Sequence, residues 1–174
     1  MSFPGNRGWQ ASVRRGRPYR WRPLWLVLVP VTAILFQVYL PLFIRYFTYL
    51  ELPLLVTVYF SLKRGRPAQG VLYGASIGLV QDSLSSNPLG MFGIVKTLVG
   101  YFSASVSLRF DVDNILVRFL LGLFFFFFHQ FFYWVLARAL LGQSLEFVIG
   151  QTLLFGLMNA AVAVPLFHLL DKLN

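Results

Sequence analysis

The stretch Gly74-Ala75-Ser76-Ile77-Gly78 contains the first residues whose spacing could support chemistry. It matches the G-x-S-x-G pattern of a hydrolase nucleophile, which requires a sharp turn between a strand and a helix. This serine lies instead within an apolar run of helical length. At 1.5 Å per residue, Ser76 lies about 12 Å from one end of the predicted bundle, whereas His129 and His168 lie at about 22 and 3 Å. Because neither histidine matches the depth of the serine, the pattern does not favour a serine hydrolase.

The rest of the sequence offers little for catalysis or metal binding. The chain has no cysteine, which excludes thiol catalysis, zinc–thiolate sites, iron–sulfur clusters and disulfides. Its two histidines fall short of the ligand number of an ordinary metal site. We therefore expect no enzyme activity, no metal and no cofactor. Polar residues within apolar runs should form hydrogen bonds between helices: His129, Gln130, Gln151 and Asn159.

Asp82 and Lys96 are the most unusual charged residues, because both lie in or beside apolar segments. A lone charge at the centre of a membrane helix costs about 2.5–3.5 kcal/mol on insertion scales. One interpretation is that both side chains extend to the outer membrane interface. The other is a buried pair that fixes the third helix against the fourth. Lys96 lies between Gly93 and Gly100 on its predicted helix face, which leaves room for its aliphatic stem.

Gly70, Gly74 and Gly78 recur at intervals of four residues. In a helix they share one face and form a groove where another backbone can approach closely. Internal packing within one bundle is the simpler interpretation. The alternative is a groove for the helix of a partner protein.

Composition places most of the chain in a membrane. Of its 174 residues, 57% are hydrophobic and only 12% are charged, whereas soluble domains carry about 25% charged residues. A soluble protein would expose this apolar surface as aggregation-prone patches. Nineteen phenylalanines exclude a disordered chain. We expect the five consecutive phenylalanines of residues 124–128 to face lipid or a partner.

The sequence predicts an all-α integral membrane protein with six transmembrane helices in one bundle. A hydrocarbon core of about 30 Å requires about 20 helical residues, and the second and third predicted segments are marginal in length. The predicted organisation is an Arg-rich cytoplasmic arm at 1–23, a membrane domain at 24–170 and a short cytoplasmic tail at 171–174. The predicted spans are Leu24–Ile44, Tyr46–Leu62, Gly70–Leu84, Leu89–Leu108, Ile115–Leu141 and Leu145–Leu170.

The distribution of basic residues predicts the orientation. With six crossings, twelve of the fifteen Lys and Arg residues fall on the side of both termini, and only Arg45 and Arg138 fall on the other. Loops rich in Lys and Arg stay in the cytoplasm, so we expect both termini there. The net charge of +9 is therefore a feature of topology, and we expect no nucleic-acid partner. The cytoplasmic set is the six arginines of the arm with Lys63, Arg64, Arg66, Arg109, Arg118 and Lys172.

Four stretches together resemble the bacterial rod shape-determining MreD family: Leu54–Pro67, Gly70–Asp82, Asn87–Gly93 and Lys96–Tyr101. They cover about residues 50–105, and the six-span layout extends the resemblance to most of the chain. The Arg-rich arm is longer than this family leads us to expect. The resemblance implies a fold similar to the substrate-capture subunits of vitamin transporters. It also implies packing or interaction roles for Gly74, Gly78, Asp82, Gly90, Lys96 and Gly100.

The resemblance implies a non-enzymatic scaffold of the bacterial cell-elongation machinery in the inner membrane. The implied partners are the single-span protein MreC, the peptidoglycan synthases RodA and a penicillin-binding protein, and membrane lipid. The actin-like MreB filament is implied too, directly or through other members. An alternative function is small-molecule capture for a transporter, which would require an outward-facing polar pocket. Its candidate residues are Gln81, Asp82, Asn87 and Lys96.

Overall fold

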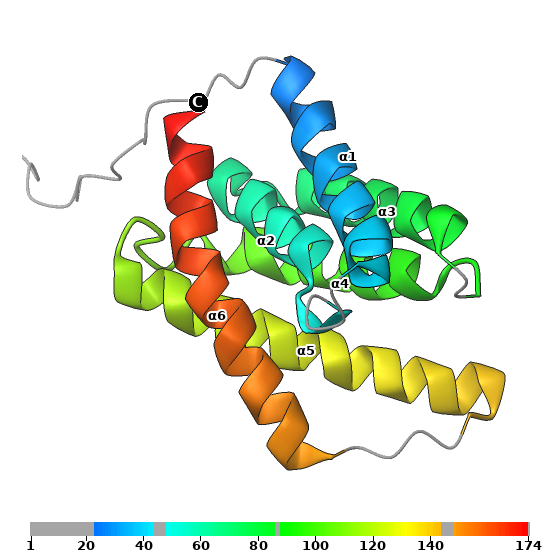
Figure 1. Ribbon diagram of the computed structural model, residues 1–174. Helices are drawn as coiled ribbons and strands as arrows, with labels where there is room; N and C mark the ends of the chain where they lie inside the picture. The colour runs from blue at the N-terminus through cyan, green and yellow to red at the C-terminus, as the bar shows by residue number, and fades with distance from the viewer. Residues whose placement is uncertain (1–22, 44–47, 86–87, 144–147, 174) are drawn as a thin grey trace, which may run out of the picture.

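The computed structural model of the chain describes residues 23–43, 48–85, 88–143 and 148–173 (Figure 1). The described ranges contain six α-helices and short 3-10 turns, and they contain no strand. The all-helical prediction is therefore confirmed for this part of the chain. The elements are α1 (Pro23–Tyr39), η1 (Leu40–Leu42), α2 (Leu52–Arg64), α3 (Pro67–Leu84), α4 (Met91–Val106), α5 (Ile115–Leu141) and α6 (Ile149–Lys172).

Two of the six helices, α5 and α6, are long and apolar enough to cross a membrane by themselves. The apolar parts of α1 and α4 are shorter, 24–39 and 91–106. α2 has 13 residues, which corresponds to about 20 Å. It begins six residues later than predicted, because Pro53 occupies the first helical turn, where proline is tolerated. Six complete spans thus remain a prediction, as does the resemblance to transporter subunits.

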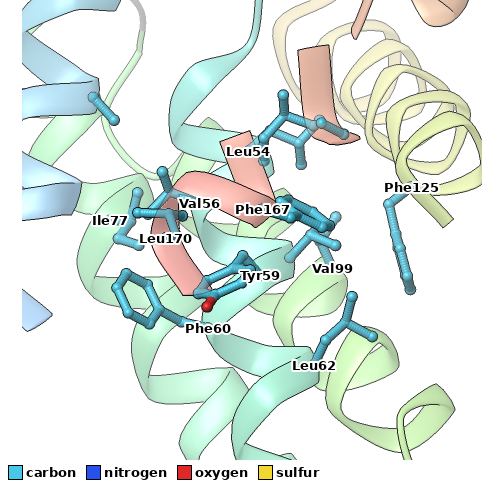
Figure 2. Close-up of a cluster of buried hydrophobic side chains, with 14 of the residues drawn as sticks. Leu54, Val56, Tyr59, Phe60, Leu62, Ile77, Val99, Phe125, Phe167 and Leu170 are labelled. Atoms are coloured by element: carbon cyan, nitrogen blue, oxygen red, sulfur yellow. The ribbon is translucent and has the colours of Figure 1, made fainter. Parts of the chain in front are cut away.

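α2 lies at the centre of the bundle. It contacts each of the other five helices, and all of its residues from 53 to 62 are buried. A helix that is apolar on every side is stable only when surrounded by protein or lipid. Side chains from all six helices meet in the resulting core, part of which Figure 2 shows. The core includes Leu54, Val56, Tyr59 and Phe60 of α2, Ile77 of α3, Val99 of α4, Phe125 of α5, and Phe167 and Leu170 of α6.

The phenylalanine run at residues 124–128 corrects one prediction. Phe125 and Phe126 are buried in the protein core, whereas Phe124 is exposed. Successive residues of an α-helix are rotated by about 100°. Five consecutive residues therefore point in all directions around α5, and only part of the run can face lipid or a partner.

Two helix pairs and one further helix, α1, surround α2. α3 and α4 are packed together most closely, and α5 and α6 form a second pair. α1 packs on α2 and α3, so that α1 and α6 lie on either side of α2 (Figure 1). This arrangement positions the glycines and the buried charges described next.

Candidate functional site

The closest contact in the bundle is a glycine seam between α3 and α4, formed by Gly70, Gly74 and Gly78 of α3 and the backbone of α4. A Cβ atom on Gly70 would overlap the carbonyl group of Gly100, and a Cβ on Gly100 would overlap that of Gly70. One turn on, a Cβ on Gly74 would overlap the carbonyl group of Lys96. A Cβ on Gly78 would lie 2.7 Å from the α carbon of Gly93. The two backbones therefore touch over three successive turns.

The helix that occupies the glycine groove is α4 of the same chain. Without a hydrophobic effect between helices in lipid, such close backbone packing is a main source of association. Because α4 covers these three glycines, the groove has no open side for a second helix. Gly93 of α4 also faces α3, because a Cβ atom on Gly93 would lie 2.9 Å from Leu79 Cδ2. The absence of a side chain at Gly93 therefore makes room for α3, and not only for the aliphatic stem of Lys96.

Asp82 caps the N-terminus of α4. Its carboxylate accepts hydrogen bonds from the backbone N–H groups of Gly90 (3.0 Å), Phe92 (3.1 Å) and Gly93 (3.0 Å). The first N–H groups of a helix have no partner within the helix, and the helix dipole favours a negative charge there. Gly90 supports the turn with a left-handed φ of 96°. Asp82 is only 2% exposed, so its charge is balanced by backbone donors inside the protein.

Lys96 is paired with Glu51 and makes no ion pair with Asp82. Its Nζ lies 3.8 Å from Glu51 Oε2 and 3.5 Å from His129 Nε2, and 4.2 Å from the ring centre of Phe92. Lys96 is 0% exposed. The predicted extension of both side chains to the membrane interface is therefore wrong, because the bundle supplies a separate partner for each charge. Both side chains are buried, as the second interpretation expected, but the expected ion pair between Asp82 and Lys96 is not formed.

Glu51 was not among the predicted site residues. Its signal in the sequence is a carboxylate at the start of an apolar segment, where an unpaired charge is costly. Its backbone N–H donates to Asn159 Oδ1 (2.8 Å), and Asn159 Nδ2 donates to the carbonyl of Tyr49 (2.8 Å). The hydrogen bonding between segments that was predicted for Asn159 is thereby confirmed. Together these contacts tie the start of α2 to α6.

The proposed polar pocket is only partly described. Asn87 lies outside the described residues. Gln81 is 3% exposed, and its Oε1 has no hydrogen-bond partner among the described residues. Two apolar cavities lie along α1, and neither of them is lined by Gln81, Asp82 or Lys96. These two cavities therefore do not form the polar pocket that small-molecule capture would require.

Ser76 lies in the middle of α3, which runs without interruption from Pro67 to Leu84. The strand-to-helix turn of a hydrolase nucleophile does not occur at this position. Ser76 is exposed on the outer face of the bundle, whereas His129 is buried inside it. The structure therefore does not bring these two side chains to a common site.

A second cluster of charges, the inner ion cluster, joins α2, α5 and α6 where α2 and α6 end. Arg118 donates to Asp171 (2.6 Å) and Asp113 (3.2 Å), and Lys63 lies 2.7 Å from Asp113 and 3.0 Å from Asp171. The hydroxyl of Tyr59 also donates to Asp171 (2.7 Å). The sequence does not predict this cluster. The sequence does contain an indication of it, since residues of opposite charge occur at the ends of segments that are predicted to lie together on the cytoplasmic side of the membrane.

Comparison with known proteins gives one match. A family model described as rod shape-determining protein MreD matches residues 20–173. No curated protein and no solved structure matches the chain.

Proposed function

The chain belongs to the MreD family of rod shape-determining proteins, and we propose that it acts as a non-enzymatic scaffold in the bacterial inner membrane. The match covers all six helices, and this is the observation that carries the proposal. Membership assigns the chain a role in determining rod cell shape and a membrane location. In the proposed role, the bundle binds other membrane proteins of cell elongation and catalyses no chemical step itself.

The outer surface of the bundle supports a scaffold. α5 and α6 are packed on one side only, and large apolar side chains are exposed along both, including Leu120, Phe131 and Leu154. In lipid these faces are available to the membrane helix of a partner without exposing backbone groups. The glycine seam and the buried charges serve in this proposal to hold the bundle in one shape. Partner binding then takes place on the outer surface.

The proposed partners are an MreC-like single-span protein and the synthases RodA and a penicillin-binding protein. We place the actin-like MreB filament as an indirect partner on the cytoplasmic side. The proposed orientation has six crossings with both termini in the cytoplasm. It rests on the excess of Lys and Arg on one side of the membrane.

A depletion experiment in the native host tests the proposed function. Loss of the protein should convert rods to round cells, and re-expression of the full chain should restore them, as measured from the ratio of cell length to width. Affinity purification in mild detergent followed by mass spectrometry should recover the MreC-like partner and the synthases. Cells that remain rods after complete depletion would contradict the proposal.

A further inference from the structure

The turn between α2 and α3 and the segment between α4 and α5 are held against each other at the end of the bundle where α2 and α4 finish. Lys63 Nζ, in the last turn of α2, lies 2.7 Å from Asp113 Oδ1 of that segment. A Cβ atom on Gly65 would lie 3.2 Å from Ser107 Oγ and 3.6 Å from Leu108 Cδ2. The two connections therefore share one surface, which we call the basic edge. Its residues are Arg64, Arg66, Leu108, Arg109 and Phe110.

The basic edge carries positive charge that its surroundings do not neutralise. The carboxylates of the neighbouring inner ion cluster are already engaged by Lys63 and Arg118. Arg66 and Arg109 are exposed, and neither forms an ion pair with another described residue. The one acidic residue of the two connections outside that cluster is Asp111. The edge therefore keeps an excess of positive charge, which favours an anionic ligand.

Arg64 adds a third guanidinium group to the edge and is held in place by a ring. Its guanidinium lies 5.9 Å from the ring centre of Tyr73 on α3, a cation–π contact. Arg64 and Arg66 directly flank Gly65, whose left-handed φ of 58° ends α2. The planar fork of N–H donors on an arginine matches the oxygen atoms of a phosphate group. Arginines at the basic edge are therefore better suited to a phosphate than to a simple halide ion.

Large apolar side chains beside these arginines favour a phospholipid as the source of the phosphate. Leu108 and Phe110 directly flank Arg109, and both are exposed. Ile115 and Leu116, in the first turn of α5, are exposed too. A phospholipid supplies a phosphate for the guanidinium groups and acyl chains that cover the apolar side chains. An acidic segment of a cytoplasmic protein matches the charge of the edge but not these side chains.

We propose that the basic edge binds the headgroup of an anionic phospholipid of the cytoplasmic leaflet, with Arg66 and Arg109 at the phosphate and an acyl chain along Leu108 and Phe110. This site rests on the membrane location and orientation of the proposed function, which place the ends of α2 and α4 on the cytoplasmic side. It makes the position of the scaffold depend on the local content of anionic lipid.

Lipid binding to the purified full chain tests the site. Delipidated protein in detergent is titrated with phosphatidylglycerol or phosphatidylcholine, and bound lipid is measured by native mass spectrometry. Arg109→Gln removes one exposed guanidinium from the edge. Arg138→Gln is the matched control, because Arg138 is an exposed arginine in the last turn of α5, at the other end of the bundle. Wild type and Arg138→Gln should prefer phosphatidylglycerol, and Arg66→Gln combined with Arg109→Gln should bind it at least about tenfold more weakly.

Several results would overturn the proposal. Equal losses of phosphatidylglycerol from Arg109→Gln and Arg138→Gln would show that binding follows net charge alone, and equal binding of both lipids to wild type would exclude an anionic headgroup. Normal lipid binding by the double variant, with loss of a co-purifying protein, would assign the edge to an acidic partner. Arg66→Gln and Arg109→Gln carry the test singly if the double variant does not fold. If wild type binds the lipid selectively but depleted cells stay rod-shaped, the site stands and the proposed function fails.

Discussion

Lys96 and Glu51 form an ion pair inside the bundle, with Nζ and Oε2 3.8 Å apart and no part of Lys96 exposed. Glu51 immediately precedes α2, and Lys96 lies in the second turn of α4. The pair therefore joins the central helix to the glycine seam. Because charges are costly in an apolar interior, each partner depends on the other.

Removing one partner of this pair should lower the free energy of unfolding more than removing both partners together. Glu51→Gln or Lys96→Met leaves a buried charge without its partner, and we expect each to lower the free energy of unfolding by about 3–5 kcal/mol. The double variant should recover part of this loss, which denaturant titration in detergent measures. Asp82→Asn combined with Lys96→Met is the control, and its coupling energy should be smaller because the two residues make no ion pair. Strictly additive effects of Glu51→Gln and Lys96→Met would contradict the pair.

Asp82 should stabilise the protein by capping the N-terminus of α4. Asp82→Ala removes the acceptor of three backbone N–H groups, and we expect a loss of about 1–3 kcal/mol in unfolding free energy. Hydrogen exchange at Gly90, Phe92 and Gly93 should accelerate, because these donors become available to solvent exchange. Asp82→Asn retains an acceptor and should give a smaller effect. Unchanged exchange at these three amides in Asp82→Ala would show that the cap is unimportant.

The glycine seam should be intolerant of a single methyl group. Gly74→Ala forces α3 away from α4, since its Cβ would lie 2.9 Å from the α carbon of Thr97 and closer still to the carbonyl of Lys96. We expect a cost of about 1–3 kcal/mol from overpacking, visible as a lower thermal unfolding temperature in detergent. Gly150→Ala in α6 is the matched control, because nothing lies within 4 Å of its added methyl. It should be neutral or slightly stabilising.

This seam also changes how partner-binding experiments are interpreted. Gly74→Leu or Gly78→Leu would disrupt the contact between α3 and α4. Loss of a co-purifying partner from these variants would therefore report a damaged bundle. Equal thermal unfolding of Gly74→Ala and Gly150→Ala would show instead that the two helices can separate without cost.

The sequence predicts some of these features and not others for identifiable reasons. Spacing of four residues places Gly70, Gly74 and Gly78 on one face whatever that face contacts. Which helix occupies the face depends on the tertiary arrangement, and here it is α4, which begins seven positions after the end of α3. The charges of Asp82 and Lys96 are evident in apolar segments, but their partners are not. Glu51 is 45 positions from Lys96, and only the packing of α2 on α4 brings them together.

The inner ion cluster should stabilise the end of the bundle at which α2 and α6 terminate. Asp171→Asn removes the carboxylate shared by Lys63 and Arg118, whose side chains are only 4% and 7% exposed. The exposed partner Asp113 cannot balance both, so we expect a loss of about 3 kcal/mol in unfolding free energy. Lys172→Gln, one residue away and exposed, is the control and should stay within about 0.5 kcal/mol of wild type. Similar stabilities of the two variants would exclude a stabilising role for the cluster.

The orientation and the number of crossings can be measured directly, because the chain has no cysteine and each introduced thiol is unique. Leu89→Cys and Gln143→Cys should react with a membrane-impermeant maleimide added outside spheroplasts, whereas Phe110→Cys should react only after lysis. Ala68→Cys, in the first turn of α3, decides whether the short helices α2 and α3 cross the membrane. Six crossings place this thiol in the cytoplasm, and protection until lysis is the expected result, because Lys63, Arg64 and Arg66 favour that side. Labelling of Ala68→Cys from outside, with Phe110→Cys still protected, would show instead that α2 and α3 form a hairpin entering from the outer face. All four positions are exposed in the structure, so unequal reactivity reports location and not burial.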